Sequence, residues 1–248
     1  MAKSATPRLR MLAGPNGSGK SFLVPSLEKE VNLGVVVNAD ELEARLKAQS
    51  SQIKELPLGD WQLQLTQDGL SAFAARPEAQ RLAAGRLRRM HIVDNTLRLV
   101  HLRIDSYLAA WLVEFFRFYL LASQQSLTFE TVMSHPSKLE FLRQAKANGY
   151  RTYLYYVATE DWSINIERVK ARVLKGGHPV SRDKIIDRYF RSLGLLYEAV
   201  KLVDRAYVFD NSLTPQLIVR ITDGQEVEYE VLSIPDWVYQ HFHLKMLG

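Results

Sequence analysis

The sequence of 248 residues contains no cysteine. Disulfide bonds, thiol catalysis and zinc sites built on thiolates are therefore excluded, and a reducing location such as the cytoplasm is expected. The N-terminus lacks a continuous apolar run, so we predict no signal peptide. The most apolar stretch, 107–122, is interrupted by Glu114 and Arg117, which makes it too short and too charged to span a membrane. We expect a helix there that is either buried or faces a partner.

A strong charge imbalance is also missing. The chain has 32 Lys and Arg against 27 Asp and Glu, a net charge of +5. A surplus of this size suits a site for phosphorylated ligands and does not require nucleic acid. No nucleic-acid recognition motif is present, and we therefore expect no nucleic-acid partner. The positive charge leaves a nucleic-acid-processing kinase as an alternative, which predicts binding to RNA or DNA that depends steeply on salt. With 47% hydrophobic residues, the chain can form one α/β domain with insertions or two small domains.

One motif stands out, the segment GPNGSGKS from Gly14 to Ser21, which fits G-x-x-x-x-G-K-[ST] at every fixed position. An apolar stretch precedes it and a helix-compatible stretch follows. Glycines allow the backbone N–H groups to bend inward around phosphate oxygens, Lys20 reaches the outer phosphates, and the Ser21 hydroxyl can ligate Mg²⁺. The motif predicts a nucleoside triphosphate site. Its residues are Gly14, Pro15, Asn16, Gly17, Ser18, Gly19, Lys20 and Ser21.

The rest of the chain alternates between strand and helix patterns. We expect five strands of a parallel sheet at 9–13, 35–38, 126–130, 150–158 and 206–209. We expect helices at 20–30, 39–48, 77–90, 101–121, 136–147, 162–174 and 182–203. This alternation implies right-handed crossovers and helices on both faces of the sheet. The predicted fold class is therefore α/β, a doubly wound parallel sheet of the P-loop NTPase type.

Two regions depart from the alternation. Residues 49–125 carry helix signals and no convincing strand, so we predict a helical insertion between the second and third strands. Near the C-terminus, 216–222 and 226–232 alternate apolar and polar residues around an Asp-Gly pair, which predicts a β-hairpin. We expect residues 1–212 to form the P-loop domain, with the hairpin and tail of 213–248 packed on it.

Asp40 follows the predicted strand 35–38, in the sequence NADEL. Open α/β sheets build their sites beyond the carboxyl ends of their strands. A carboxylate there can face the triphosphate and accept a proton from a substrate hydroxyl, which typically contributes roughly 10²–10⁴-fold to a rate. We predict Asp40 as a general base. The alternative is that Asp40 or Asn38 simply caps the helix that follows.

Glu130 and Thr131 end the predicted third strand, in LTFETVMSH. Their position beside a P-loop predicts contacts with a substrate hydroxyl or with Mg²⁺. A carboxylate that holds the metal is expected near this point, and Glu130 is the best candidate. Asp94 is a weaker one, because helix patterns flank it. The alternative is a polar pair that merely ends the strand.

The stretch 166–193 is rich in arginine. Arg168 and Arg172 share one helical face, and Gly176-Gly177 ends that helix. The loop and helix that follow carry His178, Arg182, Arg188 and Arg191. Arginines that spread the charge of a transferring phosphate can be worth roughly 10³–10⁵ in rate. We predict a lid at about 168–191 that covers the phosphates. The alternative is an ordinary basic hairpin on the surface.

Asp210 and Asn211 follow the predicted fifth strand, in VFDNS. The loop at this point of such sheets often lies near the nucleotide base. We therefore count Asn211 among the predicted nucleotide-binding residues, with a plain polar turn as the alternative.

The segments GPNGSGKS, NADEL, FETVMSH, RVKARVLKGGHPV with RYFRSL, and FDNS, in this order, resemble the zeta-toxin family of P-loop kinases, most closely its chromosomal branch. The resemblance implies a doubly wound kinase core that uses ATP and Mg²⁺, and a toxin of this kind needs an antitoxin-like protein partner. In the family's toxins, ATP phosphorylates the 3′-hydroxyl of a UDP-N-acetyl-amino sugar. The resemblance also implies that Lys20 and Ser21 hold phosphates and Mg²⁺, Asp40 is the general base, Glu130 and Thr131 hold substrate, and Arg172 or Arg168 clamps the phosphate.

This sequence departs from the family in three places. Glu130 and Thr131 are adjacent, whereas the toxins place another residue between them. A second clamping arginine would fall near His178, so Arg182 or Arg188 is expected to replace it. The usual aromatic and arginine residues after the base are here replaced by 41–43, Glu-Leu-Glu.

The expected function is an ATP-dependent kinase that transfers the γ-phosphate to a hydroxyl of a small metabolite, with a UDP-N-acetyl-amino sugar as the first candidate. Lys20, Asp40 and Arg172 are the predicted catalytic residues, and Ser21 and Glu130 the predicted metal ligands. The alternative is an ATP-hydrolysing switch or binding module that acts on a protein partner through the helix at 107–122. The sequence lacks an ABC-type signature and a guanine-specificity motif, so we expect neither a transporter ATPase nor a GTPase.

Overall fold

The computed structural model describes residues 6–247, apart from the side chains at 78 and 81. The first five residues of the predicted P-loop domain and residue 248 lie outside the described residues. The chain divides into two compact units. Unit 1 comprises 1–33 and 128–248, and unit 2 comprises 34–127.

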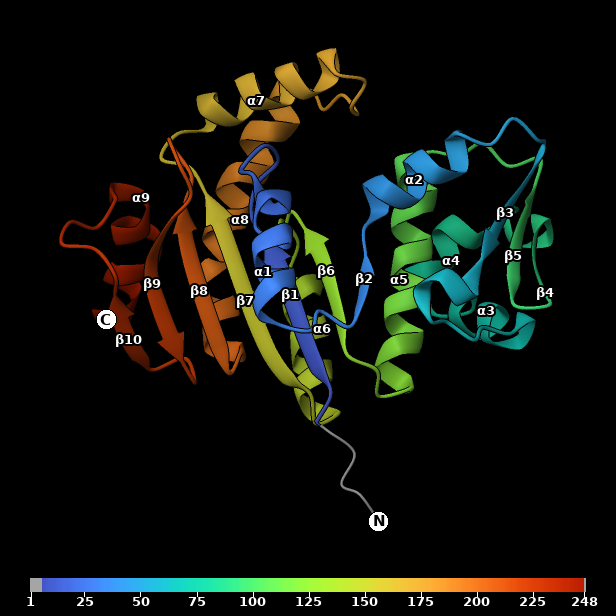
Figure 1. Ribbon diagram of the computed structural model, residues 1–248, viewed down its shortest axis with the longest axis horizontal. Coiled ribbons are helices and arrows are strands. Elements are labelled where there is room, and N and C mark those ends of the chain that lie inside the picture. Colours follow the sequence, from blue (N-terminus) through green and yellow to red (C-terminus); the bar gives the residue numbers. More distant parts are fainter. Residues whose placement is uncertain (1–5, 248) are drawn as a thin grey trace. The chain divides into compact units, whose positions relative to one another are not determined.

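The main sheet is mostly parallel and has seven strands in the order β10-β9-β8-β7-β1-β6-β2 (Figure 1). The strands are β1 Arg8–Ala13, β2 Val35–Val37, β6 Leu127–Thr131, β7 Arg151–Ala158, β8 Arg205–Asp210, β9 Gln216–Thr222 and β10 Glu226–Tyr229. β7 runs parallel to β1 and to β8, whereas β9 is antiparallel to β8 and to β10. The predicted α/β fold, its five strands and the C-terminal hairpin are confirmed. The second arm of the hairpin ends at Tyr229 rather than at Leu232.

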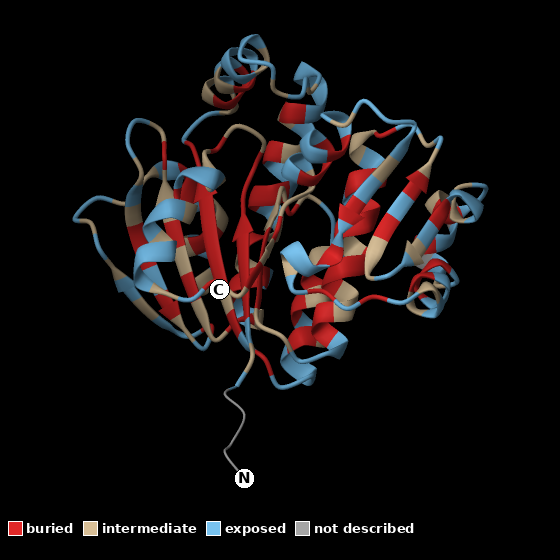
Figure 2. Cartoon of the chain, turned by 45° about the vertical axis from the view of Figure 1, so that its right-hand side comes forward, coloured by how far each residue is buried: buried red, intermediate tan, exposed pale blue. Residues whose placement is uncertain are grey.

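Helices cover both faces of the sheet in unit 1. They are η1 Lys20–Phe22, α1 Val24–Glu30, α6 Ser137–Ala147, α7 Trp162–Leu174, α8 Arg182–Leu202, α9 Asp236–Val238, η4 Tyr239–His243 and α10 Leu244–Leu247. On one face, Leu27 of α1 packs against Leu12 and Tyr155. On the other, the hydroxyl of Tyr156 lies 3.0 Å from that of Ser192 in α8. Strands covered on both sides become buried, and Figure 2 shows the central strands mostly in the colour of buried residues.

Unit 2 carries the insertion, and here the prediction of an all-helical segment is wrong. Its elements are β2, α2 Ala39–Lys47, β3 Ile53–Pro57, η2 Leu58–Trp61, α3 Gln67–Ala74, α4 Pro77–Ala83, η3 Leu87–Arg89, β4 Met90–Val93, β5 Thr96–Val100 and α5 Ser106–Ala122. Three of them form an antiparallel sheet in the order β3-β5-β4. The predicted helix 77–90 ends at Ala83, and the segment after it becomes the first arm of a hairpin.

The β4–β5 hairpin explains the difference. Asp94 and Asn95 form its two-residue turn and have positive φ angles of 48° and 53°. Two left-handed residues are what a tight turn of the type I′ class requires. In β5, buried Leu97 and Leu99 alternate with exposed Arg98, the pattern of a half-buried strand. Asp94 is therefore a turn residue between two strands, not a residue flanked by helices.

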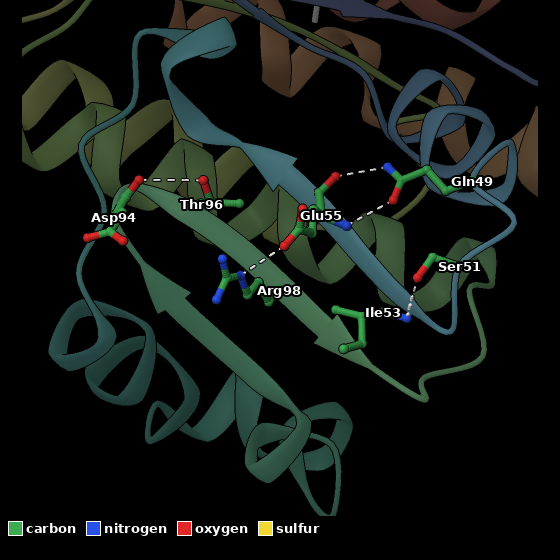
Figure 3. Close-up of polar contacts among 7 residues, drawn as sticks. All are labelled: Gln49, Ser51, Ile53, Glu55, Asp94, Thr96 and Arg98. Carbon is green, nitrogen blue, oxygen red and sulfur yellow. Dashed lines mark hydrogen bonds and ion pairs between the residues drawn. The ribbon is translucent and has the colours of Figure 1, made fainter.

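The first strand of this sheet is held at its outer edge by a side chain (Figure 3). The amide of Gln49 accepts a hydrogen bond from the N–H of Glu55 and donates one to its carbonyl, both at 2.8 Å. Across the strand pair, Arg98 forms an ion pair with Glu55 at 2.9 Å. Gln49 thus takes the place of a further strand at the edge of β3.

The most apolar helix of the chain, α5, belongs to the core of unit 2. It begins after Asp105, whose carboxylate accepts a hydrogen bond from the N–H of Leu108 at 2.8 Å. Trp111 and Phe115 are buried and pack against Phe73 of α3, with ring centroids 5.1 and 5.3 Å apart. The buried alternative for this stretch is therefore correct. Within residues 6–247, no helix is long and apolar enough to cross a membrane.

Candidate nucleotide-binding site

The loop between β1 and η1 can be built only with glycine at certain positions. Gly14 and Gly17 have φ angles of 141° and 78°, a region that side chains with a Cβ rarely enter. A Cβ on Gly14 would overlap the carbonyl of Val157 in β7, and one on Gly17 would lie 2.5 Å from the carbonyl oxygen of Asn165 in α7. The loop is therefore pressed against both elements, as a phosphate-binding loop of this motif requires.

The lysine of the motif lies over the loop itself. Its Nζ donates hydrogen bonds to the carbonyl oxygens of Gly14 and Pro15, both at 2.9 Å. The predicted helix 20–30 starts here as a short 3-10 turn and becomes α-helical at Val24. Pro25 lies in the first turn of α1, where a missing N–H costs nothing. The ammonium group of Lys20 is thus held at the mouth of the loop.

Ser21 and Glu130 meet although 109 positions separate them in the sequence. The Ser21 hydroxyl donates to Oε2 of Glu130 at 3.0 Å, which brings the end of β6 beside the P-loop. A hydroxyl and a carboxylate oxygen at this distance are the hard donors that Mg²⁺ prefers. The donor set therefore fits the predicted metal. Thr131 is occupied locally, because its hydroxyl accepts from the N–H of Met133 at 3.1 Å.

Asn211 contacts the P-loop itself. Its side-chain amide is buried and donates to the carbonyl oxygen of Ser18 at 2.7 Å. Asp210, next to it, accepts hydrogen bonds from the indole of Trp237 at 2.6 Å and from the hydroxyl of Ser212 at 3.0 Å. The sequence predicts these two residues near the nucleotide base. The geometry gives Asn211 a contact with the loop backbone, and Asp210 contacts with the C-terminal segment and the adjoining turn.

The predicted lid region consists of α7, a connecting loop and α8, and Figure 1 shows α7 beyond the carboxyl ends of the unit 1 strands. The two helices share a small apolar cluster in which Ile166 and Val169 of α7 pack with Ile185 of α8. Gly176, in the connection, has a φ angle of 86°. The helix, glycine pair and second helix are observed as the sequence predicts.

The basic residues of this region have different surroundings. Arg168 donates to the carbonyl oxygens of Asn211 and Ser212 at 2.7 and 3.2 Å. Arg172 donates to the carbonyl oxygen of His178, in the connection between α7 and α8, at 3.1 Å. Arg168 therefore contacts the turn after β8, whereas Arg172 contacts the connection that follows its own helix.

Two further arginines come from α8. The guanidinium carbon of Arg182 lies 5.4 Å from the ring centre of Trp162. Arg188 reaches the P-loop through a long hydrogen bond of 3.5 Å from Nη1 to the side-chain oxygen of Asn16. Among the lid candidates, Arg188 is thus one that touches the phosphate-binding loop.

Asp40 belongs to unit 2, in the first turn of α2. Its neighbour Asn38 is the N-cap, because the side-chain oxygen of Asn38 accepts from the N–H groups of Asp40 and Glu41 at 2.8 and 3.3 Å. The capping role therefore belongs to Asn38, and the Asp40 residue is exposed. Its role as a base stays a prediction.

Sequence reasoning missed Asn165. This residue is fully buried in the first turn of α7, its side chain is hydrogen-bonded to the hydroxyl of Thr159, and its carbonyl abuts Gly17. No motif marks it, because a lone asparagine in an amphipathic helix is indistinguishable from a surface residue. Only the approach of α7 to the P-loop gives it a place in the site.

A glycine loop between β1 and a helix, in a mostly parallel sheet covered on both faces, defines a P-loop nucleotide-binding protein. Comparison with known proteins agrees, because the family described as "AAA domain" matches residues 9–192. The chain belongs to this family. The P-loop class predicted from the sequence is thereby confirmed at the level of fold and family.

Solved structures of similar fold share little sequence with this chain. Two crystal structures of the AvrRxo1-ORF1:AvrRxo1-ORF2 complex, with sulphate ions and with ATP, match with TM-scores of 0.56 and 0.51 at 13% and 12% identity. Each match covers 92% of this chain and 62% of that chain. A structure of the PezAT chromosomal toxin-antitoxin system of Streptococcus pneumoniae matches at 14% identity with a TM-score of 0.49, over 98% of this chain and 84% of that chain.

An uncharacterized protein of Haemophilus influenzae is 37% identical over 60 residues. The match covers 24% of this chain and 43% of that protein. The chain therefore spans less than half of the curated relative and less than two thirds of the AvrRxo1 chain.

Proposed function

We propose that the protein is an ATP-dependent kinase that transfers the γ-phosphate of ATP to a hydroxyl group of a small metabolite. The observation that carries the proposal is the pairing of Ser21 and Glu130 at 3.0 Å beside a complete P-loop. Phosphoryl transfer needs little covalent chemistry from the protein, because catalysis is mostly positioning and charge stabilisation. A P-loop with a carboxylate and a hydroxyl next to its lysine offers both the positioning and the charge stabilisation.

Each part of the loop has a role in holding ATP. The N–H groups of the glycine loop surround the phosphates, and Lys20 turns from the carbonyls of Gly14 and Pro15 to phosphate oxygens. Ser21 and Glu130 would hold Mg²⁺, which when bound would supply positive charge to the phosphates. These residues supply orientation and positive charge on one side of the transferred group.

Asp40 is the proposed general base. It follows β2, at the end of a strand where open α/β sheets place their reactive groups. Its carboxylate accepts the proton of the acceptor hydroxyl as the oxygen attacks phosphorus, and Glu130 and Thr131 orient that acceptor. The assignment rests on strand position and on the resemblance to zeta toxins.

Arginines from the lid region complete the proposed site. Arg188 is supported by its contact with Asn16 in the P-loop. Arg172 is supported by the family resemblance, and it donates to the loop at His178 that joins the two lid helices. Both are proposed to spread the charge that moves with the phosphoryl group. The first acceptor to test is a UDP-N-acetyl-amino sugar, a substrate class that comes from the resemblance alone.

Two variants separate binding from transfer. Lys20→Ala is expected to lose ATP affinity, because the phosphates lose their cation. Asp40→Asn is expected to bind ATP as the wild type does but to lower the transfer rate by about 10²–10⁴-fold, the range of general-base catalysis. The measurement is ATP binding by calorimetry together with transfer of labelled γ-phosphate to a panel of metabolites. A transfer rate of Asp40→Asn equal to that of the wild type would show that Asp40 is not the general base.

The alternative of an ATP-hydrolysing switch with a protein partner loses the surface it relied on. The helix at 107–122 is α5, and its residues Trp111, Phe115 and Phe116 lie buried in the core of unit 2. An antitoxin-like partner and a cytoplasmic location remain predictions of the resemblance and the composition. Co-purification of an untagged neighbour with the tagged chain would test the partner.

A further inference from the structure

The contact between Asn211 and the P-loop determines the direction of one peptide group. In a trans peptide, the carbonyl of one residue and the N–H of the next point in opposite directions. The side chain of Asn211 holds the carbonyl oxygen of Ser18 at 2.7 Å. The N–H of Gly19 must then point away from Asn211, and in this motif the N–H groups of the loop face the phosphates.

The loop is shaped to receive this side chain. Gly19 has a φ angle of 92°, and a Cβ at this position would overlap Nδ2 of Asn211. The Asn211 residue is buried, and its own N–H donates to the carbonyl of Ala158 at 2.8 Å. A residue held by its backbone on one side and by the P-loop on the other has little freedom to move.

A second residue holds the same turn from the lid side. Arg168 of α7 donates from Nη1 to the carbonyl of Asn211 at 2.7 Å and from Nη2 to the carbonyl of Ser212 at 3.2 Å. The hydroxyl of Ser212 in turn accepts from the N–H of Glu160 at 2.8 Å. A planar guanidinium with two donors fixes both position and orientation of the groups that it binds. The turn after β8 is thus held from α7.

We propose that Asn211 and Arg168 are positioning residues that keep the P-loop in its phosphate-binding shape. The sequence points to a contact with the base for Asn211 and to a phosphate clamp for Arg168. The contacts instead form a chain from α7 through the turn at 211–212 to Ser18. This inference rests on the proposed binding of ATP but not on transfer to any acceptor.

Asn211→Asp tests the donor directly. The substitution keeps the size of the side chain but replaces the NH₂ group by an oxygen, which repels the carbonyl of Ser18 when ionised. An unsatisfied or repelled buried group of this kind is expected to weaken MgATP binding about ten-fold or more at pH 8. Lys170→Ala is the control, because Lys170 is exposed on α7, the helix that carries Arg168, and pairs with Glu167. It should bind within about two-fold of the wild type.

The pH profile separates positioning from a general loss of structure. Lowering the pH protonates the new carboxyl group, which then donates an O–H to the carbonyl of Ser18. MgATP affinity of Asn211→Asp, divided by that of the wild type at each pH, should therefore rise as the pH falls from 8 to 5. Equal affinity of variant and wild type at pH 8, or a ratio that stays flat, overturns the role of Asn211.

Arg168→Ala gives an independent test, because Arg168 lies outside the P-loop. This variant replaces Asn211→Asp as the test if Asn211→Asp does not fold. It should weaken MgATP binding, and its effect should not add to that of Asn211→Ala, because both act through one turn. Additive effects, or unchanged binding by Arg168→Ala, contradict the proposal.

A wild type that binds MgATP but phosphorylates no acceptor would refute the proposed kinase activity alone. A wild type that binds no MgATP would refute both.

Discussion

At the scale of single residues, the contact between Ser21 and Glu130 has the clearest chemical meaning. It joins the hydroxyl of the P-loop to the end of β6 at 3.0 Å. The motif predicts the serine, and the strand pattern predicts the glutamate, because strand ends gather at one edge of a parallel sheet. Their mutual distance could not be predicted, since it depends on how close β6 lies to the P-loop.

Glu130→Gln should weaken the binding of Mg²⁺ without weakening the binding of the nucleotide. The amide keeps the shape of the side chain but removes the charge that favours Mg²⁺. We expect the Mg²⁺ concentration needed for half-maximal transfer to rise about ten-fold or more, while binding of ATP without Mg²⁺ changes little. Glu140→Gln is the control, because Glu140 is an exposed acid on α6 that pairs with Arg143. An unchanged Mg²⁺ requirement in Glu130→Gln would remove Glu130 from the metal site.

Asp204 is expected to govern part of the acid stability. Burial alone would raise the pKa of its carboxyl, but hydrogen bonds from the N–H and hydroxyl of Thr152, at 2.7 and 2.9 Å, and Lys146 at 3.3 Å outweigh burial. The pKa therefore lies below its usual value of 3.8. A depressed pKa contributes stability that is present above the unfolded pKa and is lost as the pH falls through the folded one.

The measurement is the melting temperature as a function of pH for the wild type and Asp204→Asn. The wild type should lose stability below about pH 4, and the variant should lose less over the same range, since its amide does not titrate. At pH 7 the variant should already be less stable, because the ion pair with Lys146 is gone. Parallel curves for the two proteins below pH 4 would contradict the assignment.

Arg168 and Asn211 show where residue-level prediction stops. Both lie in segments that the sequence marks as functional, the lid and the turn after the fifth strand. Arg168 reaches the backbone of Asn211 across 43 positions of sequence, and Asn211 reaches Ser18 across 193. Residue type and spacing cannot reveal such pairs, because a backbone carbonyl acceptor leaves no signature in the sequence.

At the scale of elements, the long strands and helices of unit 1 could be predicted and the short strands of unit 2 could not. β7 is eight residues long and almost wholly buried, so its apolar run is unmistakable. β4 and β5 have four and five residues and one exposed face each. Their signal is a brief alternation around the Asp94-Asn95 turn, which is easily read as part of a helix pattern.

The edges of the β3-β5-β4 sheet lead to a prediction about stability and self-association. Gln49 pairs with β3, and the side chain of Gln67 accepts from the N–H of Ile92 in β4 at 2.8 Å. Unprotected strand edges invite pairing with other chains. Gln49→Ala should lower the free energy of unfolding by about 1–2 kcal/mol and increase self-association at high concentration.

Chemical denaturation and light scattering measure these two effects. Gln52→Ala is the control, an exposed glutamine next to β3 in the same unit. Equal stability and equal scattering of the Gln49 and Gln52 variants would show that the side chain of Gln49 does not protect the edge.

At the scale of the whole molecule, the proposed functions divide between the two units. Unit 1 holds the P-loop, Glu130 and the lid helices, and unit 2 holds Asp40. The C-terminal strands β9 and β10 belong to the sheet of unit 1. The P-loop and the residues that contact it, Glu130, Arg188 and Asn211, therefore all belong to unit 1, and the proposed base belongs to unit 2.

The fate of the γ-phosphate of ATP shows whether the protein is a kinase. Purified protein is incubated with Mg²⁺ and γ-labelled ATP in a small-molecule cell extract, with UDP-N-acetyl-amino sugars run separately. Label is expected on a metabolite, at a rate that falls in both Lys20→Ala and Asp40→Asn. Label released only as inorganic phosphate, at a rate that Asp40→Asn leaves unchanged, would contradict the kinase and indicate ATP hydrolysis instead.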